Sequence, residues 1–66
     1  MQLVINTYGS YLRKNGDCFL VKNEDKVFEV SVRKVDSIMI TTSAYLSTDA
    51  LKMAIENNID VIFLDE

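Results

Sequence analysis

Residues 47 to 64 read STDALKMAIENNIDVIFL, which predicts a short helix followed at once by a strand. Ser47 or Thr48 can cap this helix, and Asp49 lies in its first turn, where the helix dipole favours a negative charge. Asn57-Asn58 can adopt the left-handed conformation that ends a helix. The helix is expected to bury one apolar stripe and to turn two charged residues to water. The stripe comprises Ala50, Leu51, Ala54 and Ile55, and the charged residues are Lys52 and Glu56.

The strand after this helix, Ile59 to Leu64, contains the strongly apolar run Val61-Ile62-Phe63-Leu64. An apolar run of this kind is typical of a buried strand that has neighbours on both sides and a covered face. Only Asp65 and Glu66 follow it. We therefore expect the chain to be a piece of a larger protein, in which further chain or a partner supplies the cover.

A β-hairpin is predicted upstream of the helix, at residues 11 to 21. Asn15-Gly16 is the strongest short hairpin signal in the chain, because a two-residue type I′ turn needs positive φ at both central positions. A turn centred there sets Leu12 opposite Phe19 and Tyr11 opposite Leu20. Apolar side chains would then face each other across the two strands.

The remaining strands complete the order of elements. Leu3-Val4-Ile5 is an opening strand with a turn at Gly9, and we expect the first half of the chain to form an antiparallel meander. Residues 28 to 33 alternate with a period of two, as in a half-exposed strand, whereas residues 35 to 41 lose this alternation, which indicates burial on both faces. Residues 42 to 46 are predicted to be a short connection. The fold class is therefore α+β and mainly β, a small antiparallel sheet or sandwich with one helix between the last strands.

Length and composition limit what the chain can do. A domain of 66 residues buries only about 60% of the surface of its unfolded chain, so it needs support from another surface. The single cysteine, Cys18, excludes an internal disulfide, and histidine is absent. Zinc sites of the Cys/His type and Ser-His or Cys-His nucleophile pairs are therefore excluded from this chain.

The net charge of −3 is unevenly divided. Residues 1 to 35 carry a net charge of +2, and residues 36 to 66 carry −5. Tight binding of a phosphate backbone needs a concentrated basic surface. We therefore do not expect this chain to contain the main nucleic-acid-binding site of its protein. A peripheral nucleic-acid contact by the basic half, residues 1 to 35, is the alternative.

The carboxylates at the end of the chain form no convincing site. VIFLDE at 61 to 66 imitates a Walker B strand, but the P-loop sequence that would accompany it is missing, so we interpret it as a core strand that runs into a polar loop. Asp60 and Asp65 lie at opposite ends of this strand, about 16 Å apart, too far to share one metal ion. We therefore predict no catalytic, cofactor-binding or metal-binding residues within residues 1 to 66.

Two further features have a structural and a functional interpretation. Cys18 has the basic neighbours Arg13 and Lys14, but it lies in an apolar strand, which favours a structural cysteine over a reactive one. The three tyrosines could stack on the bases of single-stranded nucleic acid, although tyrosine in a small sheet more often packs with its hydroxyl at the rim. They are Tyr8, Tyr11 and Tyr45.

The order of these patterns resembles a known family. LVINTYGSYLRKNGDCFLV at 3 to 21, EVSVRKVDSI at 29 to 38 and SIMITTSAYLSTDALKMAIENNIDVIFLDE at 37 to 66 resemble the N-terminal domain of the CRISPR-associated integrase, the endonuclease that inserts new spacers into CRISPR arrays. The resemblance covers essentially the whole chain. It rests on apolar and capping positions, such as the spacing of Val35, Ile38 and Ile40, and not on catalytic residues.

This resemblance implies a two-domain protein, in which residues 1 to 66 are the β-rich N-terminal domain and the catalytic helical domain is absent from the sequence. In this family Glu, His and Asp of the helical domain bind a divalent metal, Mg or Mn, and none of these ligands maps onto this chain. The domain is expected to support homodimerisation and scaffolding, and the whole protein to bind DNA and a second small CRISPR adaptation protein.

One alternative and the cell compartment complete these expectations. The alternative is a free-standing protein-interaction or ligand-sensing β domain that is complete at Glu66 and unrelated to DNA. The N-terminus resembles no signal peptide, and no run approaches the roughly 20 apolar residues of a membrane span. We therefore expect a cytoplasmic protein without a membrane partner.

Overall fold

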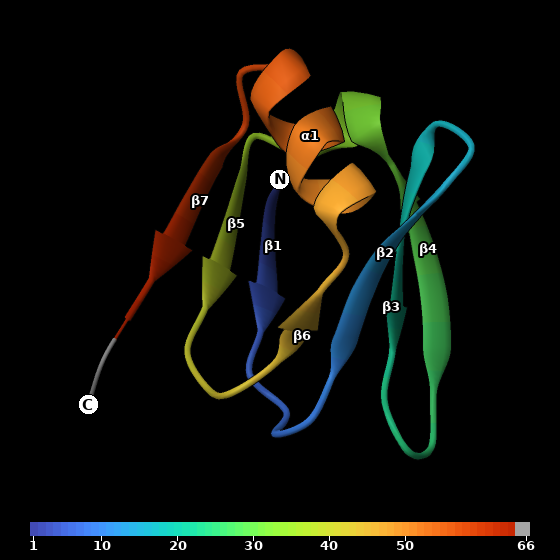
Figure 1. Cartoon of the computed structure of the whole chain (residues 1–66), viewed down its shortest axis with the longest axis vertical. Helices are drawn as coiled ribbons and strands as arrows, with labels where there is room; N and C mark the ends of the chain where they lie inside the picture. The colour runs from blue at the N-terminus through green and yellow to red at the C-terminus, as the bar shows by residue number, and fades with distance from the viewer. Residues whose placement is uncertain (65–66) are drawn as a thin grey trace.

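The computed structural model describes residues 1–64 and consists of two small sheets and one helix (Figure 1). The first sheet has the strand order β1-β5-β7, and both of its strand pairs are parallel. Its strands are β1 (Gln2–Ile5), β5 (Ser37–Ile40) and β7 (Asp60–Phe63). We call it the parallel sheet.

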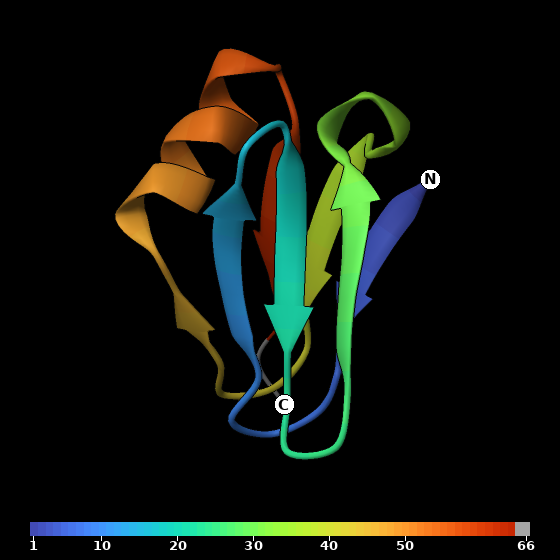
Figure 2. The same ribbon diagram turned by 90° about the vertical axis from the view of Figure 1, so that its right-hand side faces the viewer.

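The second sheet has the order β4-β3-β2-β6. Strands β2, β3 and β4 form an antiparallel meander, and β6 adds to β2 in parallel. The bounds are β2 (Tyr11–Asn15), β3 (Cys18–Lys22), β4 (Val27–Ser31) and β6 (Tyr45–Leu46). The meander lies in front of the parallel sheet as a second layer in Figure 2.

The predicted α+β, mainly β class is confirmed, with one α-helix, α1 (Thr48–Glu56), between β6 and β7. The predicted antiparallel meander is correct for β2, β3 and β4 and wrong for β1, which pairs with β5 in parallel. Parallel neighbours need a long crossover connection. The meander and the short 3-10 helix η1 (Val32–Lys34) provide it between β1 and β5, and α1 lies on the crossover between β5 and β7.

The hairpin between β2 and β3 is confirmed, but its predicted register is wrong. Leu12 lies opposite Val21, and Asn15 opposite Cys18, so the two-residue loop is Gly16-Asp17 and not Asn15-Gly16. Gly16 has a φ of +61°, as the first loop position of a type II′ turn requires. Because the register differs from the predicted one by two residues, every side chain keeps the predicted face of the sheet.

The core lies between the two sheets. Leu3, Ile38 and the other inward positions of the parallel sheet meet the inward positions of the meander, among which Phe19 is fully buried. Helix α1 covers one open side of the sandwich, at β2 and β7 (Figure 2). The buried core residues are Leu3, Ile5, Leu12, Phe19, Val21, Val35, Ile38, Ile40, Ala50, Met53, Ala54 and Ile59.

The buried stripe of α1 differs in part from the predicted one. Ala50, Met53 and Ala54 are buried, whereas Ile55 is 72% exposed. Positions 50, 53 and 54 follow the i, i+3, i+4 spacing of a single helix face, and Ile55 is turned about 100° away from Ala54. The structure also contains the two-residue strand β6, where the sequence predicted only a connection.

The predicted ends of the helix are confirmed. Ser47 is the N-cap, and its hydroxyl oxygen accepts from the Ala50 backbone N–H at 3.3 Å. The same hydroxyl donates to Asp49 Oδ1 at 2.6 Å. At the other end, Asn58 has a φ of 56°, the left-handed conformation predicted for this position.

Replacing Ser47 with alanine should lower the free energy of unfolding by about 1 kcal/mol at pH 7, because the cap of the only α-helix in residues 1–64 is lost. The Ser47 hydroxyl lowers the pKa of the Asp49 carboxyl below 3.8. A lowered folded-state pKa stabilises the fold above the unfolded value, and this contribution disappears as the pH falls through the folded value. Urea unfolding at pH 7 and pH 2.5 checks both effects, with Thr48→Ala as the control. Equal stability of Ser47→Ala and the unmodified chain at pH 7 contradicts the capping role.

Candidate functional surfaces

Within residues 1–64, no group of three His, Cys, Asp or Glu side chains is placed so that it could hold a metal ion. Asp60 lies at the start of β7, while Asp65 and Glu66 lie outside the described residues. The predicted separation of Asp60 from Asp65 and the polar loop expected at 65–66 therefore stay predictions, whereas the core strand expected at 61–64 lies in the described residues and corresponds to β7.

Cys18 is a free, half-buried cysteine at the start of β3. Its neighbours across the sheet are Asn15 on β2 and Ser31 on β4. Its half-buried position on an interior strand of the sheet fits the structural interpretation given above.

The parallel sheet has one inner and one outer face, and the outer face carries a row of apolar side chains. Val4, Met39 and Ile62 are in register across β1, β5 and β7. Met39 is half-buried, whereas Val4 is 44% and Ile62 36% exposed. We call these three residues the outer apolar row. The neighbouring row is polar, and in it the Gln2 side-chain amide donates to Ser37 Oγ at 3.1 Å.

The outer apolar row is unusual because parallel sheets normally have both faces covered. In the described chain the core covers one face, and the other keeps apolar side chains in contact with water. Strand β5 therefore agrees with the predicted burial on both faces only at its inner face. Ile38 and Ile40 on that face are buried, whereas Met39 on the outer face is half-buried. Continuous apolar runs in the sequences of β1, β5 and β7 indicated a sheet that is covered on both faces. The outer apolar row itself was not predicted from the sequence.

Strand β7 corrects the expectation of a fully buried closing strand. Within the described residues it pairs with β5 alone, so it is an edge strand of the parallel sheet. Phe63 is 65% and Leu64 49% exposed. Because an edge strand has an unpaired row of backbone groups, an apolar edge is the part of a sheet at which a further strand can pair.

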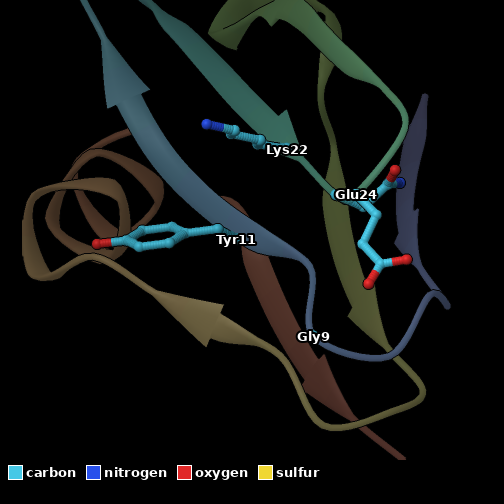
Figure 3. A pocket seen from close by; sticks show the side chains of 5 residues that line it. Gly9, Tyr11, Lys22 and Glu24 are labelled. Carbon is cyan, nitrogen blue, oxygen red and sulfur yellow. The ribbon is translucent and has the colours of Figure 1, made fainter.

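The outer face of the meander carries aromatic and basic residues. Tyr11 lies beside Tyr45 across the β2–β6 pair and beside Lys22 across the β2–β3 pair. The two tyrosine ring centroids are 6.3 Å apart with 37° between the ring planes. Figure 3 shows the side chains of Tyr11 and Lys22 extending to the same side, with Glu24 pointing the other way. The third tyrosine, Tyr8, is 75% exposed in the turn before β2.

These surfaces show which predicted residues the fold brings together. Two of the three tyrosines meet on one face, and Arg13 lies on the same face of β2 as Tyr11, two residues along the strand. No helix within residues 1–64 is both long enough and apolar enough to cross a membrane.

Comparison with known proteins identifies a family over nearly the whole chain. The family described as CRISPR associated protein Cas1 matches residues 3–66. CRISPR-associated endonuclease Cas1 2 of Saccharolobus solfataricus is 41% identical over 63 residues, which cover 96% of this chain and 20% of that protein. CRISPR-associated endonuclease Cas1 1 of Archaeoglobus fulgidus is 33% identical over 66 residues, which cover 98% of this chain and 19% of that protein. The chain thus spans about a fifth of these relatives.

Solved structures share the fold at lower identity. A partial Cas6-RT-Cas1–Cas2 complex superposes with a TM-score of 0.91 at 18% identity, over 98% of this chain and 20% of that chain. A casposase bound to integration product has a TM-score of 0.76 at 23% identity, over 97% of this chain and 22% of that chain. A TtCas1–DNA complex has a TM-score of 0.75 at 9% identity, over 88% of this chain and 22% of that chain. At these identities the likeness is one of fold.

Proposed function

Because this chain belongs to the Cas1 family of CRISPR-associated proteins, we propose that it is the N-terminal assembly domain of a metal-dependent DNA endonuclease and integrase that inserts new spacers into CRISPR arrays. The proposal is supported by the names of the two relatives, both CRISPR-associated endonucleases, of which the chain matches about a fifth. The casposase with its integration product, which has a similar domain, supports the integrase activity.

The observation that carries the assembly role is the outer apolar row. Val4, Met39 and Ile62 lie on a parallel sheet that has one uncovered face. Each buried apolar side chain contributes roughly 1.5–3 kcal/mol relative to an exposed one, so covering this row is favourable. We propose a second copy of the chain as the cover, which makes the domain a dimerisation and scaffolding unit.

The metal of this reaction belongs, in this proposal, to the helical domain of the whole protein. A divalent ion such as Mg or Mn would take several oxygen ligands. No group of three acidic, histidine or cysteine side chains within residues 1–64 is placed to supply them. When bound, the ion would stabilise the charge that develops as a DNA strand is cut and joined. The residues of this chain would contribute by holding two catalytic domains at a fixed separation.

We also propose that the whole protein binds DNA and a second small adaptation protein. The similar domains in a Cas6-RT-Cas1–Cas2 complex and in a TtCas1–DNA complex support both partners. The basic half of the chain and the polar outer face of the meander are available for such contacts.

The purified 66-residue chain should cleave no DNA in the presence of Mg²⁺ or Mn²⁺, because the proposed ligands lie in another domain. Incubation with labelled single-stranded and duplex DNA, followed by denaturing electrophoresis, measures this. The control is a whole Cas1 endonuclease such as the 41% identical relative from Saccharolobus solfataricus, which is expected to cleave and join DNA. Metal-dependent cleavage that stays with the 66-residue chain through repeated purification contradicts the proposal. A gene that stops at Glu66 would favour the free-standing interaction module instead.

A further inference from the structure

Three outward side chains form one row across three neighbouring strands of the meander sheet. Tyr45 on β6, Tyr11 on β2 and Lys22 on β3 are direct neighbours in the register. Tyr11 is 44% and Tyr45 66% exposed, so both rings present part of their surface to water. We call these three residues the tyrosine platform.

Backbone hydrogen bonds fix the strands that carry the platform. The Gly9 N–H donates to the Ser43 carbonyl at 2.9 Å, and the Tyr45 N–H donates to the Ser10 carbonyl at 2.8 Å. Gly9 has a φ of 78°, a conformation that favours glycine. Ser10 is 1% exposed, and its hydroxyl donates to the Thr7 carbonyl at 2.6 Å. The two tyrosines are therefore presented by a rigid part of the fold.

Two hollows flank the platform and share Gly9. One, of about 350 Å³, is lined by Gly9, Tyr11, Lys22, Asn23 and Glu24. The other, of about 190 Å³, is lined by Tyr8, Gly9, Ser43, Ala44 and Tyr45. In Figure 3 the Glu24 carboxylate points away from the Lys22 ammonium, and the Lys22 side chain extends to the same side as the Tyr11 ring.

We propose that the tyrosine platform stacks unpaired bases of single-stranded DNA, with Lys22 at the phosphate backbone. Exposed aromatic rings on a sheet bind bases by their π faces, and a neighbouring lysine attracts the backbone. The bases of a duplex are covered by their own neighbours, so an aromatic row on a sheet face selects unpaired ones. The choice of DNA rests on the proposed function, because a DNA integrase exposes single strands when it cuts and joins DNA.

The charge pattern of this face agrees with a polyanion. Arg13 lies about 7 Å along β2 from Tyr11, on the same face of the sheet as Lys22. The platform residue Lys22 on β3 and the neighbouring Arg13 on β2 thus provide two cations on adjacent strands. Leu20 lies opposite Arg13 and is half-buried, so it places no charge between the two cations. Glu29 on β4 lies on the same face beyond Leu20, and its carboxylate accepts from the Asn15 side-chain amide at 2.8 Å.

The test measures binding of a fluorescent 12-nucleotide dT strand to the full-length protein by anisotropy. The Tyr11→Leu/Tyr45→Leu double variant should bind it about 10-fold more weakly, and the Tyr11→Phe/Tyr45→Phe double variant should bind like the unmodified protein, since stacking survives. Lys22→Gln should reduce the slope of log K against log salt concentration by about 0.7, the contribution of one phosphate contact in a single strand.

Matched controls separate this site from the rest of the surface. Phe28→Leu removes an exposed ring on β4, and Lys26→Gln removes a charge from the loop before it; neither should alter binding. A strand that carries 5-iodouracil should crosslink to Tyr11 or Tyr45 of the unmodified protein on irradiation, which mass spectrometry of the peptides detects. This measurement needs no variant and is independent of folding defects.

Any of three outcomes would contradict base stacking by the tyrosine platform. They are unchanged dT binding by the double leucine variant, an equal loss of blunt-duplex binding by that variant, and crosslinks at neither Tyr11 nor Tyr45. Integration of a blunt duplex reports separately on the proposed function. If the protein integrates the blunt duplex but the tyrosine changes leave dT binding unaffected, base stacking by the tyrosine platform is contradicted and the proposed function stands. If the protein neither cleaves nor integrates DNA, the proposed function fails.

Discussion

Phe19→Ala is expected to unfold most or all of the domain at 25 °C. Phe19 is 0% exposed and lies on β3, the strand that pairs with both β2 and β4. Truncating a buried phenylalanine costs about 3–5 kcal/mol. A domain of 66 residues has a total stability of about 3–10 kcal/mol, from roughly 0.05–0.15 kcal/mol per residue, so this one change removes a large part of it. Circular dichroism during urea unfolding measures the loss.

The matched control for this prediction is Phe28→Ala. Phe28 lies one strand away on β4, on the same face of the sheet as Val21, but it is 46% exposed. Because much of its ring is already in water, its truncation should cost clearly less than that of Phe19. Equal losses for the two variants would mean that the core does not lie between the two sheets at Phe19.

Met39→Lys is expected to abolish self-association and, in the full-length protein, DNA integration. Met39 is the central residue of the outer apolar row, with Val4 on one side and Ile62 on the other. If a second copy covers this row, the variant buries an unpaired ammonium, which costs about 3–5 kcal/mol and weakens association more than 100-fold. Light scattering measures the mass, and a strand-transfer assay with labelled DNA measures integration.

Leu20→Lys provides the control for Met39→Lys. Leu20 is also a half-buried apolar residue on an interior strand of its sheet, but on the outer face of the meander. The same chemical change there should leave the mass unaltered. A Met39→Lys protein that stays folded, associates normally and integrates DNA would show that the outer apolar row is not the contact between copies.

Much of the fold could be predicted because local signals act over short distances. The helix from Ser47 to Asn58 was predicted from its capping residues, and the hairpin from a glycine turn between apolar strands. The exact register was not predictable from Asn15-Gly16, since Gly16 can also serve as the first residue of a type II′ turn. The parallel pairing of β1 with β5 was missed because it joins segments more than 30 residues apart, and no local pattern specifies the partner of a strand.

The candidate surfaces were less predictable than the fold. Val4, Met39 and Ile62 lie on three separate strands, and only the parallel register places them in one row. The continuous apolar runs indicated that both faces of the sheet need cover, but not which residues form the uncovered one. The meeting of Tyr11 and Tyr45 likewise depends on β6, a strand of two residues that has no clear sequence signature.

Sedimentation of the 66-residue chain across a wide concentration range tests the central claim, that this domain is an assembly unit, most directly. We expect a concentration-dependent dimer of the 7.5 kDa chain, because a second copy then covers the apolar face of the parallel sheet. A chain that is folded by circular dichroism and monomeric at every concentration would contradict the claim. In that case dimerisation would have to reside in other parts of the protein.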